Sequence, residues 1–390
     1  MGIIRTATAE PFVRPQLANA TLTTMTTATV ISPRAMNANR TVVYGTRGSV
    51  LVKSVNDGTT WTTVKDFGVT LGGFWILPNG EALVSTNTSG VGGKVLYSTG
   101  FATSDTGATW TQSAGITGGR GNDYVHPYWG LGMAPKGHVR EGLVVITKYG
   151  PHGTATTTDD EMGRVWISTD YGKTFSIIFK LESRQKLGQH MHGATYDPWD
   201  DRVIASYGDG NGGTGARADV IVCDNFLSEE PTWTPVISST SASFQLTSIL
   251  PQPDGILFGG DGTPPGIYRL PRRARRVYGA PQVVLNYGGG TDTGFIGQSM
   301  FQHAPGFPVL VGHEFTKSQV GMPASIHAIT DGSRRVSEVY RYAPNKDTAQ
   351  WPTTYAVGPT ANGKVVMLVK TYNAPGPSVW SNGVADWVTA

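Results

Sequence analysis

Two histidines separated by a single residue form the most distinctive polar feature of the sequence. They stand in the segment Gln-His190-Met-His192-Gly. In a β-strand both imidazoles would point to one face, where they could contact a sugar or, together with Asp209, hold a metal ion. The simpler alternative is that both line an interior surface and hydrogen-bond backbone or water. Since no third ligand is fixed by the spacing, we expect no metal and no other cofactor.

Two aspartates flanked by glycines recur after consecutive apolar runs, as Gly-Asp209-Gly and Gly-Asp261-Gly. An aspartate between glycines often caps a tight turn through its own backbone. Two carboxylates at equivalent positions of a repeat could also bind sugar hydroxyls. The sequence leaves both interpretations open.

The histidine and aspartate side chains must be positioned by secondary-structure elements. The sequence predicts these elements as a repeat of strands and turns. A short motif recurs seven times: apolar residues, then a proline, then a turn with Gly, Asn or Asp. A β-rich run follows each copy. The prolines are Pro33, Pro78, Pro135, Pro198, Pro251, Pro305 and Pro359, spaced by 45 to 63 residues. Proline suits a turn and not a central strand, and no segment shows a sustained helical period. The chain is therefore predicted to be all-β.

Repeats of this length, each with three or four short antiparallel strands, are typical of a β-propeller. We predict a single propeller, seven-bladed, over residues 30–390, with the prolines of the repeat on one face. Residues 1–29, rich in Thr and Ala, form an N-terminal segment that could supply the strand that closes the ring.

Antiparallel strand order predicts where a ligand would bind. If the proline turn joins the first strand of each blade to the second, first strands begin and second strands end at the opposite face. A concave surface with mixed polar and aromatic groups suits ligand binding. The predicted ligand contacts at that face are Arg47, Trp129, His190, His192, Asp209, Asp261, His313 and Tyr372.

Three segments share the pattern Ser/Thr-x-Asp-x-Gly-x-Thr-aromatic, with Asn in place of Asp in the first. Their motif residues are Ser54, Asn56, Gly58 and Trp61, then Asp105, Gly107 and Trp110, then Ser168, Asp170, Gly172 and Phe175. The pattern resembles the Asp-box of sialidase-type (BNR-repeat) propellers, over roughly residues 30–390. The resemblance implies an architectural role. The Asp and Ser would hydrogen-bond the turn backbone, the Gly would supply an unusual φ, and the aromatic would be buried between blades.

The same resemblance raises the question of catalysis. A sialidase uses three arginines to hold a substrate carboxylate, a Tyr–Glu nucleophile pair and an Asp acid/base. On the predicted ligand face the candidates for such roles are Arg120, Asp123, Tyr149 and Glu314. The arginine motif that sialidases carry in their first blade is broken here, as Phe-Val-Arg14-Pro15. A match at Tyr268-Arg269-Leu-Pro lies in the fifth repeat, where it is interpreted as an ordinary third strand. We therefore favour binding without cleavage.

The amino-acid composition and net charge exclude several classes of site and partner. The chain has one cysteine, Cys223, and a net charge of +3, which together exclude a disulfide framework, a cysteine-rich metal site and a strong attraction to nucleic acid. No apolar run is long enough for a membrane-spanning helix, and the N-terminus lacks the apolar core of a Sec signal peptide. A dense basic run, Arg269–Arg276, is predicted to be a solvated loop, with docking of an acidic neighbouring subunit as the alternative.

The Ala/Thr/Gly-rich composition resembles that of minor tail proteins of phages, several of which carry BNR-type propellers. The resemblance implies a virion protein, or one otherwise extracellular, whose partners are a cell-surface glycan of the host and other tail proteins. The predicted function is non-catalytic recognition of that glycan. The alternatives are an exo-glycosidase of sialidase type and a propeller that acts as a protein-interaction scaffold.

Overall fold

The structure, a computed structural model, describes most of the 390 residues. The described residues are 15–26, 29–87, 93–116, 124–125, 130–149, 163–181, 190–208, 218–239, 245–260, 266–286, 295–303, 307–315, 323–330, 335–344, 353–372 and 378–389. Over these ranges the chain forms strands, turns and bends but no helix, and accordingly no helix that could cross a membrane. The all-β prediction is confirmed.

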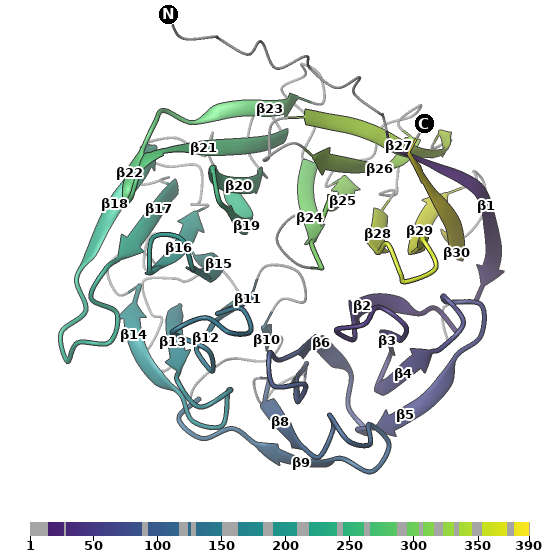
Figure 1. The fold of residues 1–390 in the computed structure, drawn as a ribbon, viewed down its shortest axis with the longest axis horizontal. Coiled ribbons are helices and arrows are strands. Elements are labelled where there is room, and N and C mark those ends of the chain that lie inside the picture. Colours follow the sequence, from purple (N-terminus) through teal and green to yellow (C-terminus); the bar gives the residue numbers. More distant parts are fainter. Residues whose placement is uncertain are drawn as a thin grey trace, which may run out of the picture.

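Seven antiparallel sheets surround a central axis as the blades of a propeller (Figure 1). Blade 1 holds β2 (Ser32–Met36), β3 (Val43–Arg47), β4 (Val50–Ser54) and β5 (Thr62–Asp66), and blade 2 holds β6 (Leu71–Ile76), β7 (Ala82–Thr86), β8 (Val95–Thr99) and β9 (Thr109–Gln112). Blade 3 holds β11 (Leu131–Met133), β12 (Val144–Tyr149), β13 (Arg164–Ser168) and β14 (Ser176–Lys180), with β10 (Tyr124–Val125) paired to the end of β12. Blade 4 holds β15 (His190–Asp197), β16 (Arg202–Gly208), β17 (Ala218–Cys223) and β18 (Trp233–Ser239).

The second half of the ring repeats the pattern. Blade 5 holds β19 (Leu246–Gln252), β20 (Gly255–Gly260), β21 (Gly266–Ala274) and β23 (Gln282–Asn286), with β22 (Val277–Tyr278) paired to the end of β21. Blade 6 holds β24 (Phe295–Phe301), β25 (Val309–Phe315), β26 (Pro323–Thr330) and β27 (Arg335–Pro344). Blade 7 holds β28 (Thr353–Val357), β29 (Lys364–Tyr372), β30 (Ser378–Thr389) and β1 (Pro15–Met25). The predicted number of blades is confirmed.

The two ends of the described chain lie side by side in blade 7 (Figure 1). Strand β1, from the start of the chain, pairs antiparallel with β30 along its length. It forms the outermost strand of a blade whose other three strands come from the end of the chain. The sheets of blades 6 and 7 also touch through a single backbone pair, Glu314 with Thr353.

The repeat of proline turns needs a correction at two blades. Pro78, Pro198 and Pro359 stand just after the first strands of their blades, as predicted, whereas Pro33 lies inside β2, opposite Gly45, and Pro251 lies inside β19, opposite Ile256. The turn of blade 1 instead begins at Asn37, whose side chain accepts hydrogen bonds from the Thr41 and Val42 amides. Proline is tolerated inside β2 because this is the edge strand of its sheet, where a missing N–H need not cost a ladder bond.

The hydrophobic core is divided among the interfaces between blades. Each neighbouring pair of blades shares one cluster of buried apolar side chains. The clusters differ in size: the one between blades 3 and 4 contains sixteen buried residues, and the one between blades 7 and 1 contains four. Among the described side chains, blade packing is therefore thinnest at the seam where the ring closes.

Candidate functional site

One end of the ring is built as strand order predicts. The described first strands begin there and the second strands end there, and we call it the channel end. Near the channel end, buried hydroxyls replace apolar side chains. Thr147, Thr247 and Thr354 donate to the carbonyl oxygens of Arg164, Gly259 and Ser325 at 2.7–3.1 Å. Ser85 donates to the Val125 carbonyl at 3.1 Å, which links blade 2 to blade 3. The channel end is thus polar inside, while the interfaces between blades are apolar.

His190 and His192 lie at the start of β15, with their ring centroids 5.0 Å apart at an interplanar angle of 73°. The ladder of β15 with β16 skips a residue between Met191 and Gly193, so His192 stands in a β-bulge, an irregularity that redirects side chains. The first strands β2, β6, β19 and β24 show the same kind of shift. The bulge brings the two imidazoles together in the ring interior.

The histidine pair is enclosed. His190 is 2% exposed and His192 is 1% exposed. A Cβ atom at Gly208 would come within 2.8 Å of His192 Cε1, so the glycine leaves room for the imidazole. The pair therefore lies beneath the surface of the channel end. Over the described residues, no group of three His, Cys, Asp or Glu side chains could hold a metal ion.

The structure describes some of the other predicted site residues fully, some by their backbone alone, and some not at all. Arg47 is half-buried at the end of β3. The backbones of Tyr149, His313, Glu314 and Tyr372 lie at or near the ends of second strands, but their side chains are outside the described residues, as are Arg120, Asp123, Trp129, Asp209 and Asp261.

Sequence reasoning missed several buried polar residues at the same end of blades 3 and 4. Lys148 and Arg164 are each 4% exposed, and the Lys148 ammonium lies 5.7 Å from the centre of the Trp166 ring. The Tyr207 hydroxyl donates to the buried Asp219 carboxylate. The signal that could have found them is a charged residue within or beside an apolar run, as in Val-Val-Ile-Thr-Lys148.

Two of the three motif turns are held by their own side chains. Ser54 Oγ and Ser168 Oγ accept the amides of Gly58 at 2.8 Å and Gly172 at 2.9 Å. Asp170 Oδ1 accepts the amides of Lys173 and Thr174, and these bonds, with that from Ser168, hold the pKa of Asp170 below its usual value despite burial. Gly58 and Gly172 have φ of 86° and 80°, and each packs against the preceding blade, on Val366 and Leu83.

The second copy departs from this pattern. Asp105 accepts from Lys53 Nζ at 2.7 and 2.8 Å and from the Tyr44 hydroxyl at 3.0 Å, so it joins blade 2 to blade 1 and does not hold its own turn. Gly107 is not among the residues with positive φ, and its amide donates to Ser104 at 3.2 Å. The predicted role of Asp105 in its own turn is therefore wrong, because Ser104 takes over the local bond and a cation is within reach.

The aromatic residues of the motif turns also differ from one another. Phe175 is buried, as predicted. Trp61 and Trp110 pack between blades but remain only half-buried, so the prediction that both are largely buried is wrong. Trp110 meets Phe67 and Phe101 edge-on, with centroids 5.1 and 5.8 Å apart.

The basic run after the third strand of blade 5 is solvated only in part, since Arg273 and Arg275 are exposed, as predicted, and Arg272 is half-buried. Arg272 forms ion pairs with the fully buried Asp197 (2.8 Å) and Asp200, and the Tyr278 hydroxyl donates to Asp200 at 2.9 Å. Burial raises the pKa of Asp197 even against the nearby Arg272, and burial beside Asp197 raises the pKa of Tyr278 to about 12. The acidic turn of blade 4 therefore neutralises Arg272 within the chain.

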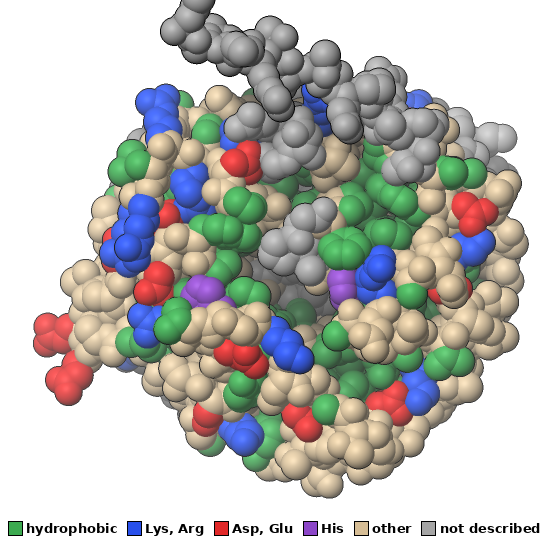
Figure 2. Space-filling view, viewed as in Figure 1, with side chains coloured by type: hydrophobic (Ala, Val, Ile, Leu, Met, Phe, Trp, Pro, Cys, Tyr) green, Lys and Arg blue, Asp and Glu red, His purple; other side chains and the backbone are tan. Residues whose placement is uncertain are grey.

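Ion pairs extend this network to both sides. Arg202 binds Asp224 bidentately at 2.7 and 2.9 Å, and Arg140 of blade 3 binds Asp201 at 3.0 and 3.0 Å. Basic side chains are seen along the rim over β21, β22 and β18 (Figure 2). In the fifth repeat, the Arg269 guanidinium binds Asp254 at 2.7 Å and Gln282 at 3.2 Å. The arginine of the motif match Tyr-Arg-Leu-Pro thus packs its own blade.

Comparison with known proteins supports the fold but assigns no family. No family model matches the sequence, and no curated protein matches it. The chain superposes on an ancestral GH74 enzyme with a TM-score of 0.53 and 9% identity, over 93% of this chain and 49% of that one, so it spans about half the length of that enzyme. A protein of unknown function from Dyadobacter fermentans (TM-score 0.47, 14% identity, 96% and 99% covered) and a chain of a mitotic checkpoint complex (0.49, 11%, 99% and 97%) also match.

Proposed function

We propose that this propeller recognises a surface glycan at the channel end of the ring and does not cleave it. The supporting observation is the histidine pair at the start of β15, which lies in a bulge and is buried at the same end of the ring as the buried threonine hydroxyls. Burying polar side chains is costly unless they are paired, and a sequence departs from an apolar interior mostly where function requires it. The pair would form the polar floor beneath a ligand bound at the channel mouth.

Binding without cleavage fits the carboxylates that the structure describes. A retaining glycosidase needs two carboxyl groups about 5 Å apart that are open to the substrate. Asp197, Asp200 and Asp201 do lie close together, but they are committed to Arg272 and Arg140 in the turn between the first and second strands, at the opposite end of the blade. Arg269, the centre of the sialidase-like match, is committed to Asp254 and Gln282.

The glycosidase remains the second candidate, because the chain shares its fold with a glycoside hydrolase, the ancestral GH74 enzyme. Fold alone does not assign an activity. Under this alternative, Glu314 and Tyr149 would supply the nucleophile pair. Arg120 would bind the sugar, and Asp123 would act as the acid/base.

The biological setting that we propose is the tail of a phage virion, where the partners are a glycan of the host surface and other tail proteins. It rests on the Ala/Thr/Gly-rich composition. A sugar contact is weak alone, and several copies on one particle would raise the avidity well above the affinity of one site. One site of modest affinity per chain is therefore sufficient for attachment of a particle that carries several copies.

The proposal is tested by titrating purified host wall polysaccharide into the whole chain. We expect saturable binding that weakens at least tenfold in Arg47→Ala and in the double variant His190→Asn/His192→Asn. Lys136→Ala, in the exposed turn at the opposite end of blade 3, is the matched control and should bind like the wild type. Because the histidines are buried, Arg47→Ala keeps the test valid if the double variant does not fold. Unchanged binding in Arg47→Ala and in a folded histidine variant would refute the channel-end site.

A further inference from the structure

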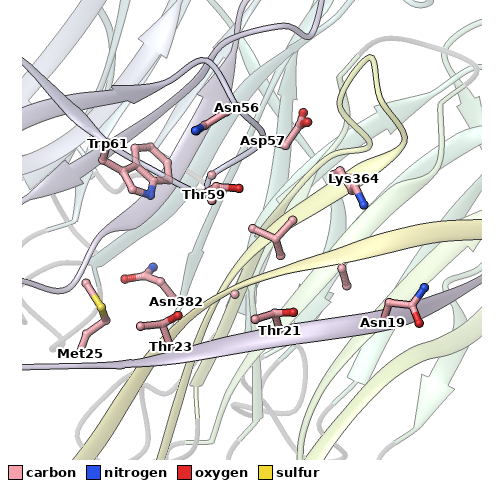
Figure 3. Close-up of a pocket in the computed structure, with 14 residues that line it drawn as sticks. Asn19, Thr21, Thr23, Met25, Asn56, Asp57, Thr59, Trp61, Lys364 and Asn382 are labelled. Atoms are coloured by element: carbon pink, nitrogen blue, oxygen red, sulfur yellow. The ribbon is translucent and has the colours of Figure 1, made fainter.

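A groove of about 450 Å³ runs along the seam where blades 7 and 1 meet (Figure 3). It is bounded by three segments that are far apart in the sequence: β1, the first motif turn, and the pair β29 and β30. In the part of the chain that the structure describes, the buried apolar cluster at this interface has four members, Met36, Val43, Val357 and Val366. The blades are therefore closely packed near the axis and diverge toward the rim, which leaves the groove open.

The wall on β1 carries a row of polar side chains. Thr21, Thr23 and Met25 alternate with Leu22 and Thr24, so they share one face of the strand. At the rise of an antiparallel strand, Thr21 to Met25 spans roughly 13 Å, and Asn19 extends the row past a register shift. Within the described residues, neither threonine hydroxyl makes a side-chain hydrogen bond. Two hydroxyls thus face the groove, spaced two residues apart.

The opposite wall is the turn that ends at Trp61. The indole is half-buried, with one part packed on the cluster between blades 7 and 1, and its nitrogen points toward Asn382 and Thr23 (Figure 3). Thr59, on the same turn, also lines the groove and is exposed. An aromatic surface therefore faces a row of hydroxyls.

Each charged group of the groove already has a partner, a carboxylate for Lys364 and a neutral amide for Asp57. Lys364 binds Asp386, and this cation lowers the pKa of the carboxyl group. Asp57 accepts a hydrogen bond from Asn362 at 2.8 Å. Asn382 is engaged on both sides with the backbone of Ile31, at 3.1 and 2.6 Å. The Asn19 amide nitrogen also donates to Asp386, at 2.9 Å. The groups left to meet a ligand are hydroxyls, an indole and the side-chain carbonyl oxygen of Asn19, which favours a neutral, hydroxyl-rich molecule.

We infer that this seam groove binds a linear neutral oligosaccharide lying along β1. Each sugar unit offers hydroxyls to the threonines and an apolar C–H face to the indole, a combination that a mixed site of this size accommodates. An extended peptide would instead add to the outer backbone edge of β1, which among the described strands pairs with β30 alone. The site lies on the side of the ring, away from the channel end, and is thus independent of the site proposed above.

The test is calorimetric titration of the whole chain with cellohexaose, maltohexaose and chitohexaose, each beside its disaccharide. At least one hexasaccharide should bind at least tenfold more tightly than its disaccharide. Thr21→Val/Thr23→Val should weaken that binding at least tenfold, because it removes both hydroxyls and keeps the shape and the strand. Thr24→Val, on the other face of β1, is the matched control and should bind like the wild type.

Thr59→Ala, on the opposite wall, should weaken binding severalfold and provides a second test if the valine pair lowers the melting temperature. The inference is overturned if none of the hexasaccharides binds at millimolar concentration, or if both groove variants bind like the wild type. It is also overturned if binding is kept in the groove variants and lost in Arg47→Ala, a result that would leave the channel-end proposal standing. Loss in the groove variants with wild-type binding in Arg47→Ala supports the seam groove by itself.

Discussion

His327 shows how one buried side chain makes this ring sensitive to acid. The residue is 5% exposed on β26, and burial lowers the pKa of its imidazole to about 4, against the opposing effect of Glu338 at 4.0 Å. The unfolded chain takes up the proton near pH 6.5, whereas the folded chain does not until near pH 4. The neutral form therefore stabilises the fold fully above pH 6.5, and that stability is lost as the pH falls toward 4.

At about 1.4 kcal/mol per pH unit, His327 should cost the fold about 3 kcal/mol between pH 6.5 and 4. We expect urea unfolding to show this loss in the wild type and a much flatter profile in His327→Asn. The carboxylates of Asp170 and Asp201, whose pKa values are lowered, act in a different window, since their contribution is lost only below about pH 4. An equal slope above pH 4.5 in both proteins would contradict the assignment to His327.

Single residues also mark the limit of prediction from sequence. His190 and His192 were singled out from their spacing, and the structure brings their rings together. Their burial could not be predicted, because it depends on a bulge in β15 and on residues of other strands. Arg272 illustrates the same limit. Its partners Asp197 and Asp200 are more than seventy residues away in the sequence, so the basic run alone could not indicate that Arg272 is neutralised within the chain.

At the scale of elements, similar turns perform two different tasks. Asp170 stabilises its own turn, whereas Asp105, at the equivalent position of its motif, joins two blades through Lys53 and Tyr44. A double-mutant cycle separates the two tasks. We expect Asp105→Asn and Lys53→Met to show a coupling of about 1 kcal/mol in unfolding free energy. Asp170→Asn with Lys173→Met should show none within error, since Lys173 donates to Asp170 through its backbone amide.

Coupling of equal size in both cycles would contradict this division of tasks. The strands themselves were predictable, because an apolar run, a turn and a second run are local patterns that recur seven times. Pro33 misled the prediction of its turn, since the sequence does not reveal that β2 is an edge strand. The role of Asp105 could not be predicted from its motif, because the competing Lys53 lies on another blade.

At the scale of the whole molecule, the ring closes through β1. Leu17 and Leu22 of this strand pack on the cluster between blades 6 and 7, and Leu22 lies so close to Gly383 that a Cβ atom there would come within 2.3 Å of Leu22 Cδ2. We therefore expect Gly383→Val to displace β1, at a cost of about 1–3 kcal/mol for overpacking. Amide hydrogen exchange should become faster in residues 15–25 while β16 and β20 keep their protection.

Gly363→Ala provides the control, since no atom lies near its Cβ position and only its positive φ opposes the change. It should leave exchange in β1 unchanged. Wild-type protection of β1 in Gly383→Val would show that the ring does not depend on this contact. The number of blades was predictable because the repeat pervades the chain, but the groove at the seam was not, because it results from packing between the two ends of the chain.

The central property proposed for this propeller is that it binds a glycan and leaves it intact. The most direct measurement is a calorimetric titration with host wall polysaccharide, followed by counting of reducing ends in the same cell after prolonged incubation. We predict saturable binding with no increase in reducing ends over a protein-free sample. Absence of saturable binding would refute glycan recognition, and a steady release of reducing ends that stops in Glu314→Ala would show that the protein is a glycosidase.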